Sequence, residues 1–138
     1  MRIAVDFDGT IVEQKYPDIG KERPFASEAL RQLIADGHKL ILWTVRSGRL
    51  LDEAVDWCKT RGILFYAVNS NHPEGYLFGH QKERSPKVNA DLYIDDSNFG
   101  GVPEWDEIYK TISGSSGEKL SGAKYKRGFL FGLGNKRI

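Results

Sequence analysis

The chain of 138 residues has almost no cysteine and no long apolar run. Its one cysteine, Cys58, excludes a disulfide within the chain, so nothing points to an oxidising compartment. No stretch of 18 apolar residues occurs, and the N-terminus leads into a strand-like segment rather than a signal-peptide core. We therefore expect a cytoplasmic protein that does not enter the membrane.

A strong net charge is also lacking, because 20 basic residues nearly balance 19 acidic ones. The balance is uneven along the chain. Residues 1–113 contain 14 basic and 18 acidic residues, whereas residues 114–138 contain six basic residues and one acidic residue. The size fits a single domain. We predict a catalytic domain over residues 1–113, followed by a basic tail rich in Gly and Ser over residues 114–138.

The tail interleaves basic and aromatic residues: Lys124, Tyr125, Lys126, Arg127, Phe129 and Phe131. Such a pattern can bind nucleic acid. A flexible tail without that role is the preferred interpretation, so nucleic acid remains an alternative partner.

Apolar segments along residues 1–113 alternate between the patterns typical of strands and of helices. The strands are expected at 3–7, 39–45, 63–68 and 92–94, and the helices at 24–36, 48–60 and 103–112. This alternation predicts an α/β fold, a three-layer Rossmann-like arrangement with a central parallel sheet covered on both faces. Ligands of such sheets bind at the carboxyl ends of the strands.

Two carboxylates mark the end of the first expected strand, where Asp6 and Asp8 are followed by Gly9 and Thr10. Residues two apart in a strand point to the same side, so the two acids arrive together. Close carboxylates repel each other unless a cation or a shared proton compensates them. The pair suits a divalent metal and a nucleophile beside an acid or base. The alternative is an ordinary strand followed by an Asp-Gly turn with solvated acids.

Further polar residues lie where other strands begin or end. Thr44 is near the end of the second strand, Lys87 precedes the fourth, and Asp95 and Asp96 follow it. Taken alone, Thr44 reads as an ordinary strand residue, Lys87 as a surface lysine and the acidic pair as a turn. Lys82 competes with Lys87 for the same role.

In this order, Asp6-Phe7-Asp8-Gly9-Thr10, Thr44, Lys87 and Asp95-Asp96 resemble the four motifs of the haloacid dehalogenase (HAD) superfamily. Those motifs are a DxDxT/V segment, a Ser or Thr closing the second strand, a Lys or Arg before the fourth strand, and an acidic pair after it. The resemblance covers residues 1–113. It implies the HAD fold and a phosphomonoester hydrolase that acts through an aspartyl-phosphate.

The resemblance also implies roles for single residues. Asp6 would be the nucleophile, and Asp8 the general acid that later serves as general base. Thr44 would hydrogen-bond a phosphoryl oxygen, and Lys87 would offset the charge of the phosphoryl group. Backbone N–H groups from Phe7 through Gly9 to Thr10 would bind the phosphoryl oxygens. Arg46 is a candidate for contacting the substrate, or for an ion pair with an acid near the start of the following helix.

Mg²⁺ is the implied cofactor, because it prefers hard oxygen ligands. The implied ligands are a carboxylate oxygen of Asp6, the backbone carbonyl of Asp8, and Asp95. Asp96 is either a fourth direct ligand or a support for the others.

No separate cap domain is expected, because the intervals in which related proteins insert one are short. The interval from Thr10 to Pro24 holds about a dozen residues, and 69–86 holds 18, too few for an independent core. An open rim would admit a large phosphorylated substrate, or a neighbouring subunit of a homo-oligomer could close it over a small ester. The loop 69–86 is expected to contact the leaving group. Two other functions stay open: a nucleic-acid end-processing phosphatase, and a non-catalytic module that binds phosphate or a partner.

Overall fold

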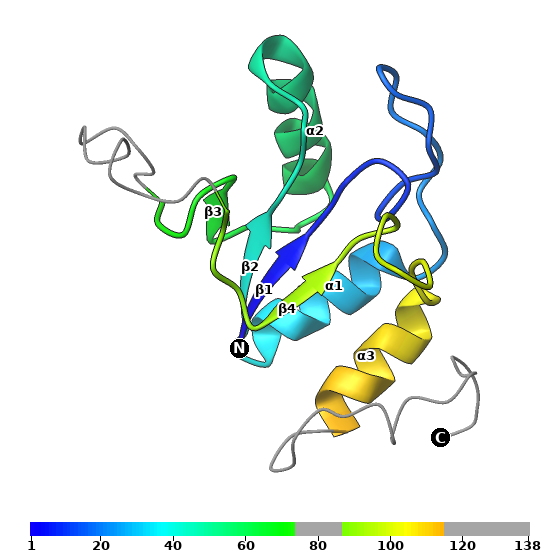
Figure 1. Ribbon diagram of the computed structural model, residues 1–138, viewed down its shortest axis with the longest axis vertical. Coiled ribbons are helices and arrows are strands. Elements are labelled where there is room, and N and C mark those ends of the chain that lie inside the picture. Colours follow the sequence, from blue (N-terminus) through cyan, green and yellow to red (C-terminus); the bar gives the residue numbers. More distant parts are fainter. Residues whose placement is uncertain (74–86, 115–138) are drawn as a thin grey trace.

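A parallel sheet of four short strands forms the centre of the structure, a computed structural model that describes residues 1–73 and 87–114. The elements are β1 (Arg2–Val5), α1 (Ala26–Ala35), β2 (Lys39–Leu42), α2 (Gly48–Thr60), β3 (Ala67–Val68), β4 (Leu92–Ile94) and α3 (Trp105–Gly114). The strand order is β3-β2-β1-β4, with every pair parallel (Figure 1). The predicted α/β fold with a central parallel sheet is confirmed.

The register of the central strands separates the apolar side chains into two layers. Ile3 pairs with Leu40 on one side and with Leu92 on the other, so these three side chains share a face. The buried residues of all three helices belong to the cluster of that face: Leu30, Leu33, Ala54, Cys58, Ile108 and Ile112. Because the chain moves from β1 to β2 to β3 in one direction, right-handed crossovers place α1 and α2 on the same face.

The opposite face of the sheet carries a second, smaller cluster. Its buried members are Ala4, Ile41, Ala67 and Val88, and the partly buried rings of Trp43, Tyr66 and Tyr93 pack against them. Both faces of the sheet therefore carry buried apolar side chains. All three described helices lie on the first face, where α1 and α3 pack against each other (Figure 1).

Helix boundaries follow the sequence closely, whereas the third strand is shorter than predicted. Helix α2 occupies the predicted range 48–60, with Ser47 as its N-cap residue, although the Ser47 side chain makes no capping hydrogen bond. Gly37, with a φ of 99°, follows the C-cap residue of α1. Strand β3 has only two residues, Ala67 and Val68, which pair with Ile41 and Leu42 of β2. Helix α3 ends at Gly114, and the predicted tail beyond it lies outside the described residues.

From β1 the chain adds β2 and β3 on one side of the sheet and then returns to add β4 on the other side of β1. Sheets of this class bind ligands at the carboxyl ends of the two strands where this change of direction occurs, here β1 and β4. Two segments project from this carboxyl end of the sheet: residues 13–21, called the arm here, and the loop 95–101 that follows β4 (Figure 1). The arm is closed at its base by the Glu13 N–H, which donates to the carbonyl of Lys21.

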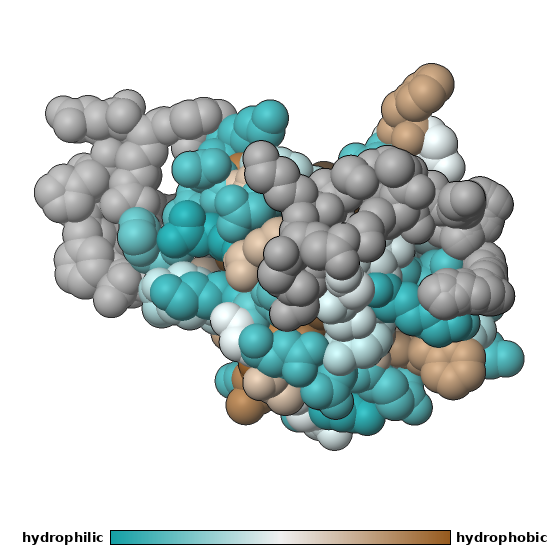
Figure 2. Space-filling view, turned by 90° about the horizontal axis from the view of Figure 1, so that it is seen from below, coloured by the Kyte–Doolittle hydropathy of each residue, from teal (hydrophilic) through white to brown (hydrophobic). Residues whose placement is uncertain are grey.

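Seen from the amino ends of the strands, the described surface is mostly hydrophilic, with small apolar areas (Figure 2). None of the helices in the described part of the chain is long and apolar enough to cross a membrane.

Candidate active site

Three carboxylates converge where β1 and β4 end. Asp6 is the first residue after β1, and its N–H donates to the carbonyl of Ile94, the last residue of β4, at 2.9 Å. Asp95 and Asp96 follow β4 directly. One oxygen from each of the three carboxylates lies within 4.8 Å of the other two. The structure thus brings together Asp6, Asp95 and Asp96, as the sequence predicts for neighbouring parallel strands.

This crowding changes the ionisation of Asp6. Burial raises the pKa of its carboxyl to about 8, helped by a hydrogen bond with Asp96 and by the negative charge of Asp95. A cation among the three groups would offset that repulsion. Oxygen atoms alone make up this donor set, which suits a hard divalent cation such as Mg²⁺.

The hydroxyl of Thr10 links the carboxylates and is fully buried. It accepts a hydrogen bond from the N–H of Asp96 at 3.0 Å. Its oxygen also lies 3.2 Å from Asp6 Oδ2 and 3.3 Å from Asp96 Oδ1, and its one hydrogen can go to either. The indole N–H of Trp105 holds the Thr10 carbonyl at 2.8 Å. Thr10 therefore orients the acids rather than a substrate.

The predicted backbone cradle for the phosphoryl group is wrong for two of its members. The N–H of Gly9 donates to the carbonyl of Val12 at 2.7 Å, and that of Thr10 donates to the carbonyl of Phe7 at 3.1 Å. Both donors are used in the tight turn after Asp8, so neither is available to a ligand. The Phe7 side chain is buried in the core, and its N–H bonds the Asp6 carboxylate.

Gly9 is required by geometry, because its φ is 86° and a Cβ atom there would lie 2.3 Å from Asp96 Oδ2. Gly37→Ala is a matched control, since φ is 99° there and no atom lies within 4 Å of the added Cβ. Both changes should cost on the order of 1–3 kcal/mol of unfolding free energy from backbone strain. A cation held by Asp6, Asp95 and Asp96 would bind about tenfold or more weakly in Gly9→Ala alone, because only that change displaces Asp96. Urea unfolding and Mg²⁺ titration measure both effects, and equal Mg²⁺ affinities in the two variants would contradict this role.

The carboxylate of Asp8 lies close to this cluster but binds Arg46. Arg46 Nε donates to Asp8 Oδ2 and Nη2 donates to Oδ1, each at 2.7 Å. The Arg46 side chain is 0% exposed and that of Asp8 8%, so this is a buried, bidentate ion pair. The hydrogen bonds with Asp8 raise the pKa of the Arg46 guanidinium further. The resemblance implies a metal contact through the backbone carbonyl of Asp8, which this ion pair leaves unused.

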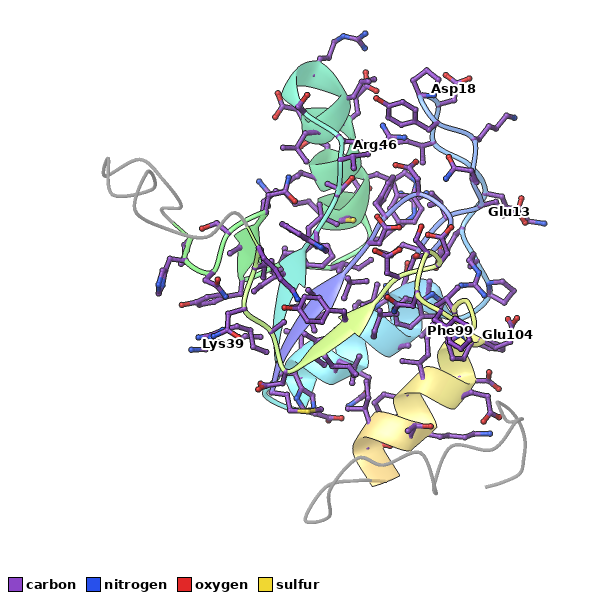
Figure 3. The ribbon with its side chains drawn as sticks, viewed as in Figure 1. Glu13, Asp18, Lys39, Arg46, Phe99 and Glu104 are labelled. Carbon is purple, nitrogen blue, oxygen red and sulfur yellow. The ribbon has the colours of Figure 1, made fainter. Side chains whose placement is uncertain are left out.

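Arg46 also ties the arm and helix α2 to the site. Its guanidinium donates to the carbonyl of Asp18 in the arm at 3.0 Å and to that of Leu50 in α2 at 3.3 Å. The rings of Phe7 and Tyr16 lie 5.3 Å and 5.2 Å from the guanidinium carbon. Figure 3 shows Arg46 between α2 and the arm segment that carries Asp18. Of its two predicted roles, substrate contact and ion pair, the structure shows the ion pair, with Asp8 as partner.

Thr44 and Lys87 lie outside the lining of the acidic cavity. The N–H of Thr44 donates to Asn69 Oδ1 at 2.8 Å, and its hydroxyl accepts from the N–H of Arg46 at 3.1 Å. Lys87 Nζ lies 5.5 Å from the centre of the Tyr93 ring. Their expected contacts with a phosphoryl group stay predictions. Lys82 and the rest of the loop expected to meet the leaving group, residues 74–86, lie outside the described residues.

A cavity of about 300 Å³ opens above these groups. It is lined by Asp6, Asp8, Gln14, Tyr16, Val45, Asp95, Asp96 and Ser97. Sequence reasoning did not assign four of them: Gln14, Tyr16, Val45 and Ser97. Val45 directly follows Thr44 and Ser97 directly follows Asp96, so their places in the sequence could have indicated that they lie near the site. For Gln14 and Tyr16 no signal existed, because only the folding of the arm brings them to the cavity.

Comparison with solved structures gives one strong likeness, to the conserved protein coded by a locus of Bacteroides thetaiotaomicron. The two chains are 50% identical, with a TM-score of 0.79, and the likeness covers 92% of this chain and 98% of that one. This chain belongs to the same family. The family likeness spans nearly the full length of both chains. Comparisons with family models and with curated proteins give no match. The name of that relative states no activity, so the function is argued from the site.

Proposed function

We propose that the protein is a Mg²⁺-dependent phosphomonoester hydrolase of the HAD superfamily that acts through an aspartyl-phosphate on Asp6. The observation that carries this proposal is the convergence of Asp6, Asp95 and Asp96 at the ends of β1 and β4. Asp8 lines the same open cavity. One cavity therefore offers a nucleophile, a second carboxylate for proton transfer and oxygen ligands for a cation.

Asp6, Asp95 and Asp96 would hold the cation, and Thr10 fixes their mutual orientation. When bound, Mg²⁺ would neutralise charge on the phosphoryl oxygens and on the carboxylates. The remaining chemistry belongs to the two aspartates of the first motif.

Asp8 first takes up a proton from solvent on a lone pair that Arg46 leaves free. An Asp6 oxygen then attacks phosphorus, and the bond from phosphorus to the leaving oxygen breaks as Asp8 delivers that proton to the leaving oxygen. In the second step water attacks phosphorus, Asp8 takes the water proton, and the bond to Asp6 breaks to release inorganic phosphate. Each Asp8 oxygen accepts one bond from Arg46, which leaves a further lone pair on each for the transferred proton. Arg46 fixes the orientation in which Asp8 works.

A substrate panel tests the proposal. It contains aryl phosphates, phosphorylated metabolites and oligonucleotides with 3′- or 5′-phosphates, each assayed with Mg²⁺ and with a chelator. We expect Mg²⁺-dependent release of phosphate from small esters. Turnover of the oligonucleotides alone would favour the end-processing alternative, and no turnover of any compound would favour a binding module.

The pKa of Asp6 predicts how the cation stabilises the fold. Because this carboxyl has a pKa near 8 in the folded protein and 3.8 as the ordinary value, the cation-free fold loses stability as pH rises from about 4 to 8. Below pH 8 a bound cation must also displace the Asp6 proton. The rise in Tm on adding Mg²⁺ should therefore be larger at pH 8.5 than at pH 6, and the difference should vanish in Asp6→Asn. Scanning fluorimetry measures it, and equal rises at both pH values in the unmodified protein would contradict the assignment.

A further inference from the structure

The wall of the cavity above the acids has an unusual composition. Among the lining residues that the structure describes, four are carboxylates and none is a lysine or arginine. The nearest buried cation, Arg46, is neutralised by its bidentate pair with Asp8 and is 0% exposed. Arg46 offsets the charge of Asp8, and a divalent cation would offset two of the three remaining carboxylates. One negative charge would be left, which repels a negative group on the leaving side of a substrate.

Apolar side chains form the outer part of the same wall. Tyr16 is 48% exposed and Val45 is 89% exposed. Both line the cavity beside the carboxylates. An apolar surface left exposed at the mouth of an acidic cavity gains free energy when an apolar ligand group covers it.

The backbone around both side chains is fixed. On either side of Val45, the N–H of Thr44 donates to Asn69 and the N–H of Arg46 donates to the Thr44 hydroxyl. The N–H of Tyr16 donates to Gln14 Oε1 at 3.1 Å, and its ring lies against the Arg46 guanidinium. The backbone that carries the two side chains is thus hydrogen-bonded before any ligand binds, and the Tyr16 ring also rests beside Arg46. Both features lower the entropy cost of covering the two side chains.

We propose that the cavity selects phosphate monoesters whose leaving group carries no negative charge and presents an apolar, preferably aromatic, face to Tyr16 and Val45. This inference rests on the proposed function, because it assigns the leaving group of the same reaction. The negative charge of the wall gives the charge selection, and the exposed apolar side chains of Tyr16 and Val45 give the selection for an apolar leaving group. Esters with a second phosphate or a carboxylate on the leaving group are selected against.

Three phosphate esters of similar phenols test the charge selection: 4-ethylphenyl phosphate, O-phosphotyramine and 4-(2-carboxyethyl)phenyl phosphate. They share the aromatic ring and differ in the charge at the end of its substituent. We expect KM of the anionic ester to exceed that of the neutral one by about tenfold or more, with KM of the cationic ester equal or lower. Values of kcat should agree within about threefold, because the leaving oxygen is the same.

Substitution of the apolar wall tests the contact itself. Tyr16→Ser should raise KM for 4-ethylphenyl phosphate by about tenfold while the inhibition constant of inorganic phosphate stays within about twofold, since phosphate has no leaving group. Tyr16→Phe keeps the ring and should restore most of the lost affinity. Leu64→Ala is the control, because Leu64 is an exposed apolar residue outside the cavity lining.

Equal KM values for the three esters would overturn the inference, as would equal changes for ester and phosphate in Tyr16→Ser. If the protein hydrolyses other compounds in the panel but none of these three aryl esters, the inference is overturned as well. Those results leave the hydrolase proposal intact. Failure to hydrolyse any phosphate ester would instead overturn the proposed function, and with it the inference.

Discussion

Asp6→Asn is expected to lower kcat by a factor of about 10³ or more, because an amide is a far weaker nucleophile toward phosphorus than a carboxylate. The fold should remain intact, since the change preserves volume and removes one of three mutually repelling carboxylates. At pH 8.5 without a cation, the variant should be at least as stable as the unmodified protein. Aryl phosphate turnover and thermal unfolding followed by circular dichroism measure the two effects.

Asp56→Asn provides the matched control, because Asp56 lies exposed on α2, outside the cavity lining. It should leave both kcat and Tm unchanged. Retention of more than a tenth of the activity in Asp6→Asn would exclude Asp6 as the nucleophile. A loss of Tm in that variant would mean that Asp6 is needed for folding.

Arg46→Met is expected to destabilise the protein by about 3–5 kcal/mol, since it leaves the buried carboxylate of Asp8 without its partner. The double variant Asp8→Leu/Arg46→Met removes both charges and should recover a large part of that loss, because burying an apolar pair costs much less than burying an unpaired charge. Urea unfolding of the two single variants and the double variant measures the coupling. Equal losses in Arg46→Met and in the double variant would contradict the role of the pair.

A surface pair supplies the control for this measurement. Arg49 and Glu53 on α2 form an ion pair at 2.6 Å, with the Arg49 side chain 79% exposed. Solvent screens such pairs, so Arg49→Met should change the unfolding free energy by less than about 1 kcal/mol. The contrast between Arg46 and Arg49 isolates burial as the cause of the difference.

The helices could be predicted from sequence because their signals are local. In α2 the apolar spacing indicates the observed range 48–60. Strand β3 could not be delimited in this way. Residues 63–66 have strand-like character, but the paired strand begins only at Ala67, opposite Ile41 of β2, just after the N–H of Tyr66 donates to the carbonyl of Leu40. Pairing between strands depends on the neighbouring strand, which a single segment does not encode.

The acid cluster could be predicted because parallel strands deliver their carboxyl ends to one edge. Asp6 and Asp95 are far apart in sequence, yet β1 and β4 are neighbours. The partner of Arg46 could not be chosen from sequence, because Asp8 is 38 residues away and the arm had no predicted position. The backbone N–H groups of Gly9 and Thr10 were wrongly predicted to bind a ligand for a similar reason. The turn in which they donate hydrogen bonds depends on backbone angles, such as the φ of 86° at Gly9, which the sequence does not specify.

Trapping of the covalent intermediate tests the central claim most directly. The protein is mixed with a phosphate ester labelled in its phosphoryl group, quenched in acid during turnover, and treated with borohydride, which reduces an acyl phosphate to the alcohol. We predict that the label is bound to protein before reduction and that peptide mass spectrometry then finds homoserine at Asp6, with neither signal in Asp6→Asn. Rapid turnover without protein-bound label, or modification at a residue other than Asp6, would contradict an aspartyl-phosphate on Asp6.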